Sequence, residues 1–104
     1  KLANIKTFAG FLRRINAESH SDKVLSVAYF LLTTQNKTTF TKEDVEAQYK
    51  GAFLPKSKNT SAEINNLIQR GHLMQNDEKI DGKRSFMITT DGIQHVEEEL
   101  IKHE

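Results

Sequence analysis

Residues 60–73, TSAEINNLIQRGHL, contain the pattern that decides the fold. The apolar residues of this stretch recur at steps of three and four, which places them on one face of a helix: Ile64, Leu67 and Ile68. Thr60 with Glu63 forms a capping-box pattern for the start of that helix, and Gly71 is the residue expected to end it. The stretch therefore predicts a helix over about 60–70 that is followed by a sharp turn.

A different periodicity begins after this helix. Leu73, Phe86 and Ile88 alternate with more polar neighbours, as in half-buried strands. The segment between them, Asn76 to Arg84, is polar and contains Asp81–Gly82, a favourable pair for a tight turn. These features predict a hairpin with a long charged tip.

Helices are also predicted before and after this central part. The N-terminal helix has its apolar residues at helical spacing: Ile5, Phe8, Phe11, Leu12 and Ile15. A second helix, from about Asp22 to Thr33, is expected to start at a cap formed by Ser19 and Asp22. The last helix follows a cap at Thr89 or Thr90. Its apolar residues are Ile93, Val96 and Leu100.

A short strand and a third helix are predicted between the second helix and residue 60. Residues 38–40 favour a short strand. Thr41 with Asp44 repeats the capping pattern and opens a helix that runs to Lys50. We expect Gly51 to end this helix in a left-handed conformation.

The second helix is apolar around most of its circumference, which is typical of a helix buried on two sides. One stripe contains Val24, Leu25, Ala28, Leu31 and Leu32, and the opposite side has Val27, Tyr29 and Phe30. The N-terminal helix is the expected cover for this opposite side. The alternative is a homodimer or another domain of the parent protein, bound through Phe8, Phe11, Tyr29 and Phe30.

Length and composition indicate one domain with one core. The chain has 104 residues, of which 37% are hydrophobic, and no apolar run approaches the roughly 20 residues of a membrane span. It has no Cys, which excludes a disulfide framework and makes a cytoplasmic location the expectation. Because it begins with Lys1 and has no secretory signal pattern, we interpret it as a fragment of a longer protein.

The predicted order is helix, short strand, helix, helix, hairpin, helix. In this order, Leu67–Leu73 and Phe86–Gly92 resemble the end of the recognition helix and the closing wing strand of winged helix-turn-helix domains in bacterial and archaeal regulators. The resemblance covers about residues 19–100. It implies an α+β, mainly α fold, with an N-terminal helical extension or linker at 1–18 and the winged domain with its C-terminal helix at 19–104. It also implies double-stranded DNA binding in transcription regulation.

Candidate base contacts lie on the helix of residues 60–70. If the apolar stripe is turned inward, the outward face of this helix carries side chains of types that can hydrogen-bond to base edges: Ser61, Asn65, Asn66 and Gln69. Asparagine and glutamine can form paired hydrogen bonds with adenine in the major groove, and serine bonds more permissively. An ordinary solvated helix face has the same polarity, so this interpretation takes its support from the resemblance.

Candidate phosphate contacts come from cations before and after this helix and at the hairpin tip: Lys50, Lys56, Lys58, Arg70, Lys83 and Arg84. The formal net charge is only +1, but residues 1–60 carry ten Lys and Arg against five Asp and Glu, whereas residues 61–104 carry five against nine. DNA binding would therefore depend on a local basic surface and on salt concentration. Scattered solubilising charges are the alternative.

Enzymatic motifs are lacking in the sequence. It has no phosphate-binding glycine loop and no nucleophile elbow. The histidines, at unrelated spacings, are His20, His72, His95 and His103. We predict no catalytic residue, no metal and no cofactor.

The alternative function is a module for protein–protein interaction or oligomerisation within a multidomain protein. Besides the aromatic residues of the first two helices, Phe53 and Leu54 in the connection provide apolar surface. Aromatic side chains that the fold leaves uncovered would mark a surface for a partner.

Overall fold

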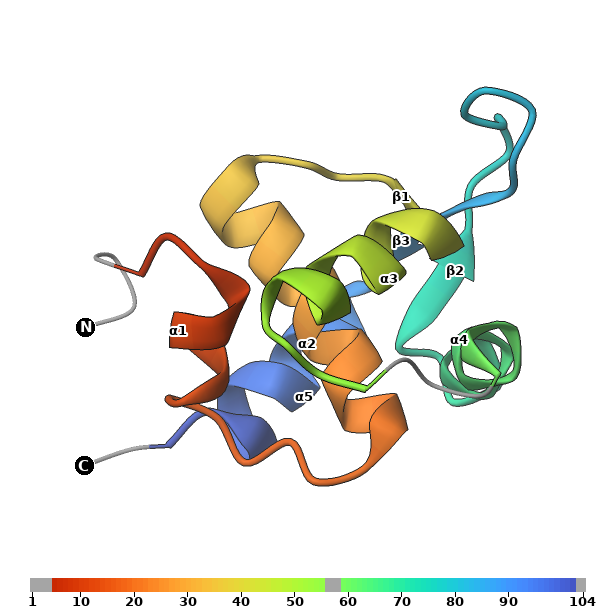
Figure 1. Ribbon diagram of the computed structural model, residues 1–104. Coiled ribbons are helices and arrows are strands. Elements are labelled where there is room, and N and C mark those ends of the chain that lie inside the picture. Colours follow the sequence, from red (N-terminus) through yellow and green to blue (C-terminus); the bar gives the residue numbers. More distant parts are fainter. Residues whose placement is uncertain (1–4, 56–58, 103–104) are drawn as a thin grey trace.

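The computed structural model describes residues 5–55 and 59–102, and its fold is mainly helical with one small antiparallel sheet (Figure 1). The α+β, mainly α class predicted from the sequence is thereby confirmed. In chain order the elements are α1 (Phe8–Leu12), α2 (His20–Gln35), β1 (Phe40–Thr41), α3 (Lys42–Gly51), α4 (Thr60–Gln69), β2 (Leu73–Gln75), β3 (Ser85–Ile88), α5 (Thr90–His95) and the π-helical turn η2 (Val96–Leu100). No helix within the described ranges has the length and apolar character that crossing a membrane requires.

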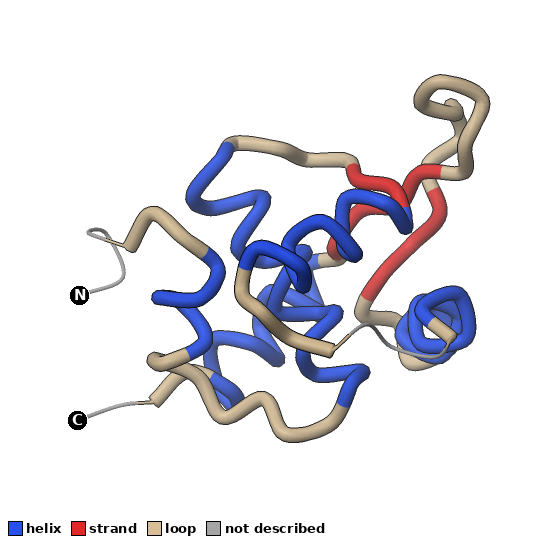
Figure 2. The backbone as a smooth tube through the Cα atoms, viewed as in Figure 1, coloured by secondary structure: helices blue, strands red, loops and turns tan. Residues whose placement is uncertain are grey.

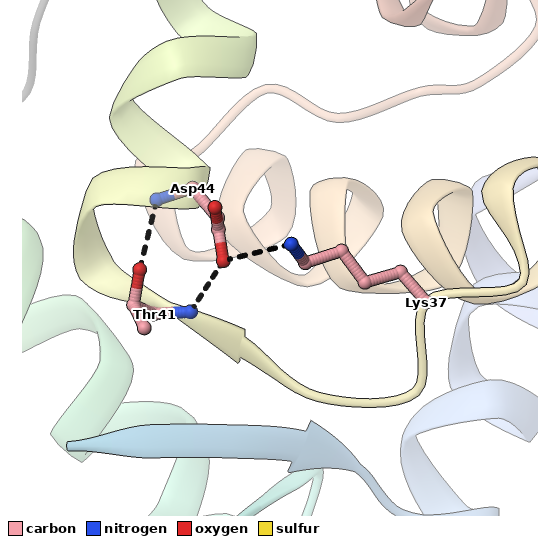
Figure 3. Close-up of polar contacts among 3 residues, drawn as sticks. All are labelled: Lys37, Thr41 and Asp44. Atoms are coloured by element: carbon pink, nitrogen blue, oxygen red, sulfur yellow. Dashed lines mark hydrogen bonds and ion pairs between the residues drawn. The ribbon is translucent and has the colours of Figure 1, made fainter. Parts of the chain in front are cut away.

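The N-caps of α2 and α3 are those that the sequence predicts, but α2 spans His20–Gln35 and is longer than the predicted range of about Asp22 to Thr33. Ser19 Oγ accepts a hydrogen bond from the backbone N–H of Asp22 at 3.1 Å. Thr41 and Asp44 form a complete capping box, in which each side chain accepts a bond from the other residue's backbone N–H. Figure 3 shows this box together with Lys37, whose Nζ lies 3.5 Å from Asp44 Oδ2. These side chains bond to amides that have no partner within the first helical turn, which fixes where each helix begins.

The start of α4 differs from the prediction. Asn59 is its N-cap, and the Asn59 side-chain oxygen accepts a hydrogen bond from the N–H of Ala62 at 3.0 Å. Thr60 is instead the first helical residue and is buried. Asparagine is among the strongest N-cap residues and stands one position earlier, so the predicted box of Thr60 with Glu63 does not form.

The end of α3 also differs from the prediction. Gly51 is the last helical residue, and the left-handed residue is Phe53, with a φ of 58°. The N–H of Leu54 donates to the carbonyl of Tyr49 at 2.9 Å, as in a Schellman-type helix end, where glycine usually occupies the left-handed position. Leu54 packs against the core, and this contact shifts the left-handed position from Gly51 to Phe53.

Replacing Phe53 by glycine is expected to stabilise the fold. A side-chained residue in the left-handed region costs about 1–2 kcal/mol, and the Phe53 ring is 94% exposed, so its loss removes little packing. We expect Phe53→Gly to raise the free energy of unfolding by about 1 kcal/mol, measured by urea denaturation. Phe53→Ala, which keeps a Cβ, is the control and should give no gain. A Phe53→Gly protein no more stable than the parent would contradict this account of the helix end.

The sheet has the strand order β1-β3-β2, with both pairs antiparallel (Figure 2). Leu73 pairs with Ile88, and Phe86 lies opposite both Phe40 and Gln75. The predicted hairpin is confirmed, and the predicted short strand lies at Phe40–Thr41 instead of 38–40. Because β1 immediately precedes α3, its pairing with β3 brings the start of α3 next to the hairpin.

The core is centred on α2, whose residues from Val24 to Leu31 are all buried. The rings of α1 cover one side of α2: the centroids of Phe8 and Phe30 lie 5.8 Å apart, and those of Phe11 and Tyr29 lie 5.8 Å apart. The prediction that the N-terminal helix covers this side is confirmed. The alternative that Phe8, Phe11, Tyr29 and Phe30 bind a homodimer or parent-protein partner is wrong, because they are 0–6% exposed and pack on one another.

The two ends of the described chain join on this same side. The predicted N-terminal helix is shorter than its apolar pattern, because Ile15 forms a bridge with Ile101 and not a further helical turn. The N–H of Asn16 donates to the carbonyl of Leu100 at 2.7 Å. Tyr29 Oη donates to a carboxylate oxygen of Glu97 at 2.9 Å, and burial together with this carboxylate raises the pKa of Tyr29 to about 12. Residues before α2 therefore share one core with the rest of the chain.

Candidate nucleic-acid interface

The amide-bearing face of α4 is open to solvent. The residues predicted to contact base edges are all exposed on this helix: Ser61, Asn65, Asn66 and Gln69. On the opposite face Ile64 and Leu67 are each 1% exposed, and Leu73 of β2 is 2% exposed beside them. Gly71, the residue predicted to end this helix, has a left-handed conformation with a φ of 83°, and this lets the chain turn from α4 into β2. The spacing that buries the aliphatic residues thus turns the amides outward.

A tight turn closes the hairpin tip. Asp81 and Gly82 have φ values of 52° and 77°, and Ile80 and Lys83 exchange two backbone hydrogen bonds of 2.9 Å each. Two consecutive left-handed residues are typical of the type I′ turns that fit the twist of a hairpin. The turn therefore presents Lys83 at a defined position.

Side-chain hydrogen bonds brace the base of the tip. Ser85 Oγ, which is fully buried, donates to the carbonyl of Glu78 at 2.6 Å. Asn76 Nδ2 donates to Ser85 Oγ and to the same carbonyl, each at 3.2 Å. Because these bonds join both arms of the hairpin, the position of the tip follows that of the sheet.

Arg84 is held by two contacts from neighbouring strands. Its Nη2 donates to Gln75 Oε1 at 2.8 Å, and its guanidinium carbon lies 5.3 Å from the centre of the Phe86 ring. A cation over an aromatic face is attracted to the ring, and the fixed side chain loses less entropy when it binds an anion. Arg84 is therefore oriented before any ligand arrives.

A cavity of about 250 Å³ lies where α4, the start of α3 and the hairpin meet. Its lining contains residues from each: Lys42, Glu43, Ser61, Ile64, Asn65, Lys83, Arg84 and Phe86. Two predicted base-contact residues and two predicted phosphate-contact residues are thus brought together. The sequence interpretation missed Lys42, because only the pairing of β1 with β3 brings it beside the hairpin.

The other predicted cations lie elsewhere or outside the described residues. Lys50 is near the end of α3 and lines a separate groove with Phe53. Arg70 is exposed at the C-cap of α4 and does not line the cavity. Lys56 and Lys58 fall outside the described ranges. Of the four predicted phosphate contacts that lie within the described residues, Lys83 and Arg84 line this cavity.

Carboxylates moderate the positive charge of this region. Glu43 lines the cavity itself, and Asp77, Glu78 and Asp81 are exposed on the hairpin tip. On the inner side of α4, Glu63 Oε1 is buried without a hydrogen-bond partner among the described residues. Burial and the charge of Glu63 raise the pKa of Tyr49 on α3. The cavity is therefore a mixed site with an excess of cations.

Two of the histidines are closer to each other than their sequence spacing indicates. The rings of His72 and His95 are stacked with their centroids 4.6 Å apart. Across residues 5–55 and 59–102 no cluster of three or more His, Asp or Glu side chains has the arrangement of a metal site. The histidine pair lies at the junction between α4 and α5.

A scan against protein-family models, a search of curated proteins and a search of solved structures each give no match for this chain. Function is therefore inferred from the geometry of the described residues.

Proposed function

We propose that this chain is a winged helix-turn-helix domain that binds double-stranded DNA without catalysing a reaction. In this proposal α3 and α4 are the helix-turn-helix pair and the hairpin of β2 and β3 is the wing. The observation that carries it is the cavity at which Ser61 and Asn65 of α4 meet Lys83 and Arg84 of the hairpin. The domain would serve transcription regulation as part of a larger cytoplasmic protein.

The exposed face of α4 supplies the contacts to bases. Placed in the major groove, Asn65, Asn66 and Gln69 offer paired donors and acceptors that match adenine, and Ser61 adds a single hydroxyl. The aliphatic face of α4 stays against the core, so docking requires no rearrangement of the helix. Sequence preference would come from these amides.

The cations beside α4 supply the contacts to phosphates. Lys83 and Arg84 from the hairpin and Lys42 from α3 flank the helix on the side of the cavity, so they can meet the backbone next to the groove. Arg70, Lys50, Lys56 and Lys58 are proposed to add weaker contacts. Because Glu43 and the carboxylates of the tip oppose binding, we expect moderate affinity with a steep salt dependence.

Charge reversal at the hairpin tests this function. Binding of a mixed-sequence 20-base-pair duplex is followed by fluorescence anisotropy over a salt series for the parent and for two double variants. The first, the hairpin pair, combines Lys83→Glu with Arg84→Glu, and the second combines Lys102→Glu with Lys23→Glu. We expect the hairpin pair to weaken binding at low salt by about 10- to 100-fold and to reduce the salt slope by about 2. The second pair makes the same change in net charge away from the cavity lining and should leave the salt slope unchanged. Equal effects of the two pairs would contradict a specific basic surface.

A second candidate function, a protein-interaction module, is favoured by one observation. Phe53 is 94% exposed and borders a groove of about 780 Å³ whose apolar lining includes Ala47, Leu54 and Pro55. An exposed aromatic residue beside an apolar groove is typical of a surface for a partner's side chain. Weak DNA binding with a flat salt response in all the variants above would favour this function.

A further inference from the structure

The histidine pair, His72 and His95, joins α4 to α5. His72 follows Gly71 at the turn after α4, and His95 is the last residue of α5. Their rings are stacked, with an angle of 21° between the planes and 4.6 Å between the centroids. Both residues are partly buried. A change at this contact therefore acts on the end of the helix that carries the amide-bearing face.

The backbone around His72 is held to the start of α5. The carbonyl of His72 accepts a hydrogen bond from the N–H of Thr89 at 3.0 Å, and the carbonyl of Gly71 accepts one from Thr89 Oγ1 at 2.6 Å. A Cβ at Gly92 would lie only 2.2 Å from the His72 carbonyl oxygen. The close approach of α5 leaves His72 little room to move while these bonds persist.

The surroundings of His72 favour a neutral ring. Its Nδ1 is buried and has no hydrogen-bond partner among the described residues. In a neutral imidazole with its proton on Nε2, the buried Nδ1 carries only a lone pair. In the imidazolium, Nδ1 carries an N–H donor that has no acceptor, which costs more free energy.

The charged groups around His72 come from α2, α4 and α5. Burial, followed by His95 and by Arg70 at the end of α4, lowers the pKa of His72, and Asp91 of α5 and Asp22 of α2 oppose that shift. The two carboxylates reduce the shift without reversing it. Neutral His72 is therefore the form that fits the closed junction.

We propose that the stacked histidine pair is a pH-dependent contact, which holds the end of α4 against α5 while His72 is neutral and releases it when His72 is protonated. The buried Nδ1–H of the His72 imidazolium then lacks an acceptor and has to move to solvent, and positive charge on His95 opposes the charged form of His72. The turn at residues 70–73 opens, and α4 is less firmly oriented. This inference concerns the attachment of α4 and holds whether or not the chain binds DNA.

The direction of the pH dependence follows from linkage. The pKa of His72 is lower in the closed form than in an opened, solvated form, for which about 6.5 is the ordinary value. The open form therefore binds more protons, and the closed form loses stability as the pH falls through about 6.5 toward the lowered pKa.

Amide hydrogen exchange by NMR between pH 8 and pH 5 tests the proposal, with protection factors corrected for intrinsic exchange. In the parent protein we expect protection at residues 70–73 and 89–92 to fall about tenfold or more on acidification, while α2 keeps its protection. His72→Phe keeps an aromatic ring that cannot be charged, so this fall should disappear. His95→Gln removes a group that lowers the pKa of His72, so the fall should become smaller, which gives a second measurement if His72→Phe does not fold.

His20→Gln is the matched control, since His20 is exposed at the start of α2 and the variant also replaces one imidazole. It should leave the pH response of residues 70–73 as in the parent. Protection that is independent of pH at residues 70–73, or that falls equally throughout the chain, overturns the proposal. A local fall that persists unchanged in both His72→Phe and His95→Gln also overturns it.

Discussion

Replacing Phe30 by alanine is expected to lower the free energy of unfolding by about 3–5 kcal/mol. Phe30 is fully buried in α2, and its ring contacts the rings of Phe8 and Phe11 at centroid distances of 5.8 and 5.9 Å. Truncation removes the buried ring and leaves a cavity between α1 and α2 that the surrounding helices can fill only in part. The stability of a domain of this size is about 5–15 kcal/mol, so a loss of this size should lower the melting temperature by more than about 10 °C. Urea denaturation measures the same loss as a free energy of unfolding.

The matched control for this prediction is Phe53→Ala, which truncates the same side chain at a position that is 94% exposed. It should change the free energy of unfolding by less than about 0.5 kcal/mol. The comparison separates burial from residue type, because the same atoms are deleted in both variants. Equal melting temperatures for the two variants would show that α1 does not cover α2.

The second large effect is expected at Gly92 in α5. A Cβ there would lie 2.2 Å from the carbonyl oxygen of His72 and 2.8 Å from a side-chain carbon of Ile88. Gly92→Ala therefore forces the backbone of α5 away from that of residues 71 and 72. Thr89 caps α5 and forms hydrogen bonds to both of these residues at the same place. We expect a loss of about 2–4 kcal/mol in chemical denaturation, which combines overpacking with weakened cap hydrogen bonds.

Gly51→Ala is the control for this substitution, because a Cβ at Gly51 has no atom within 4 Å and the residue lies in α3. Alanine is the better helix former, so this variant should be as stable as the parent or gain up to about 1 kcal/mol. If Gly92→Ala matches Gly51→Ala in denaturation, the close approach of α5 to His72 is wrong.

Elements with strong local signals are predicted well from the sequence. The caps at Ser19 and Thr41 and the turn at Asp81–Gly82 occur as predicted, because each depends on hydrogen bonds or φ values within four residues. The exposed amides of α4 follow in the same way from the spacing of Ile64 and Leu67. Where two local signals compete, the prediction fails: Asn59 displaces Thr60 as the cap of α4.

Contacts between distant residues are not predicted by local patterns. Lys42 reaches the cavity because Phe40 pairs with Phe86, and Phe53 takes the left-handed position because Leu54 packs against the core. The stacking of His72 on His95 follows from the close packing of α5 against the turn after α4. None of these pairings has a spacing that the sequence reveals.

The sequence by itself determined where most helices begin and which face of residues 60–69 is polar, since capping and helical periodicity act over a few neighbouring residues. Only the tertiary structure decided between α1 and a partner as the cover of the aromatic side of α2. It alone gathers Lys42, Lys83 and Arg84 beside α4 and brings two histidines together. The physical reason is that burial and strand pairing bring together side chains that are far apart along the chain, and their partners depend on how all the elements pack at once.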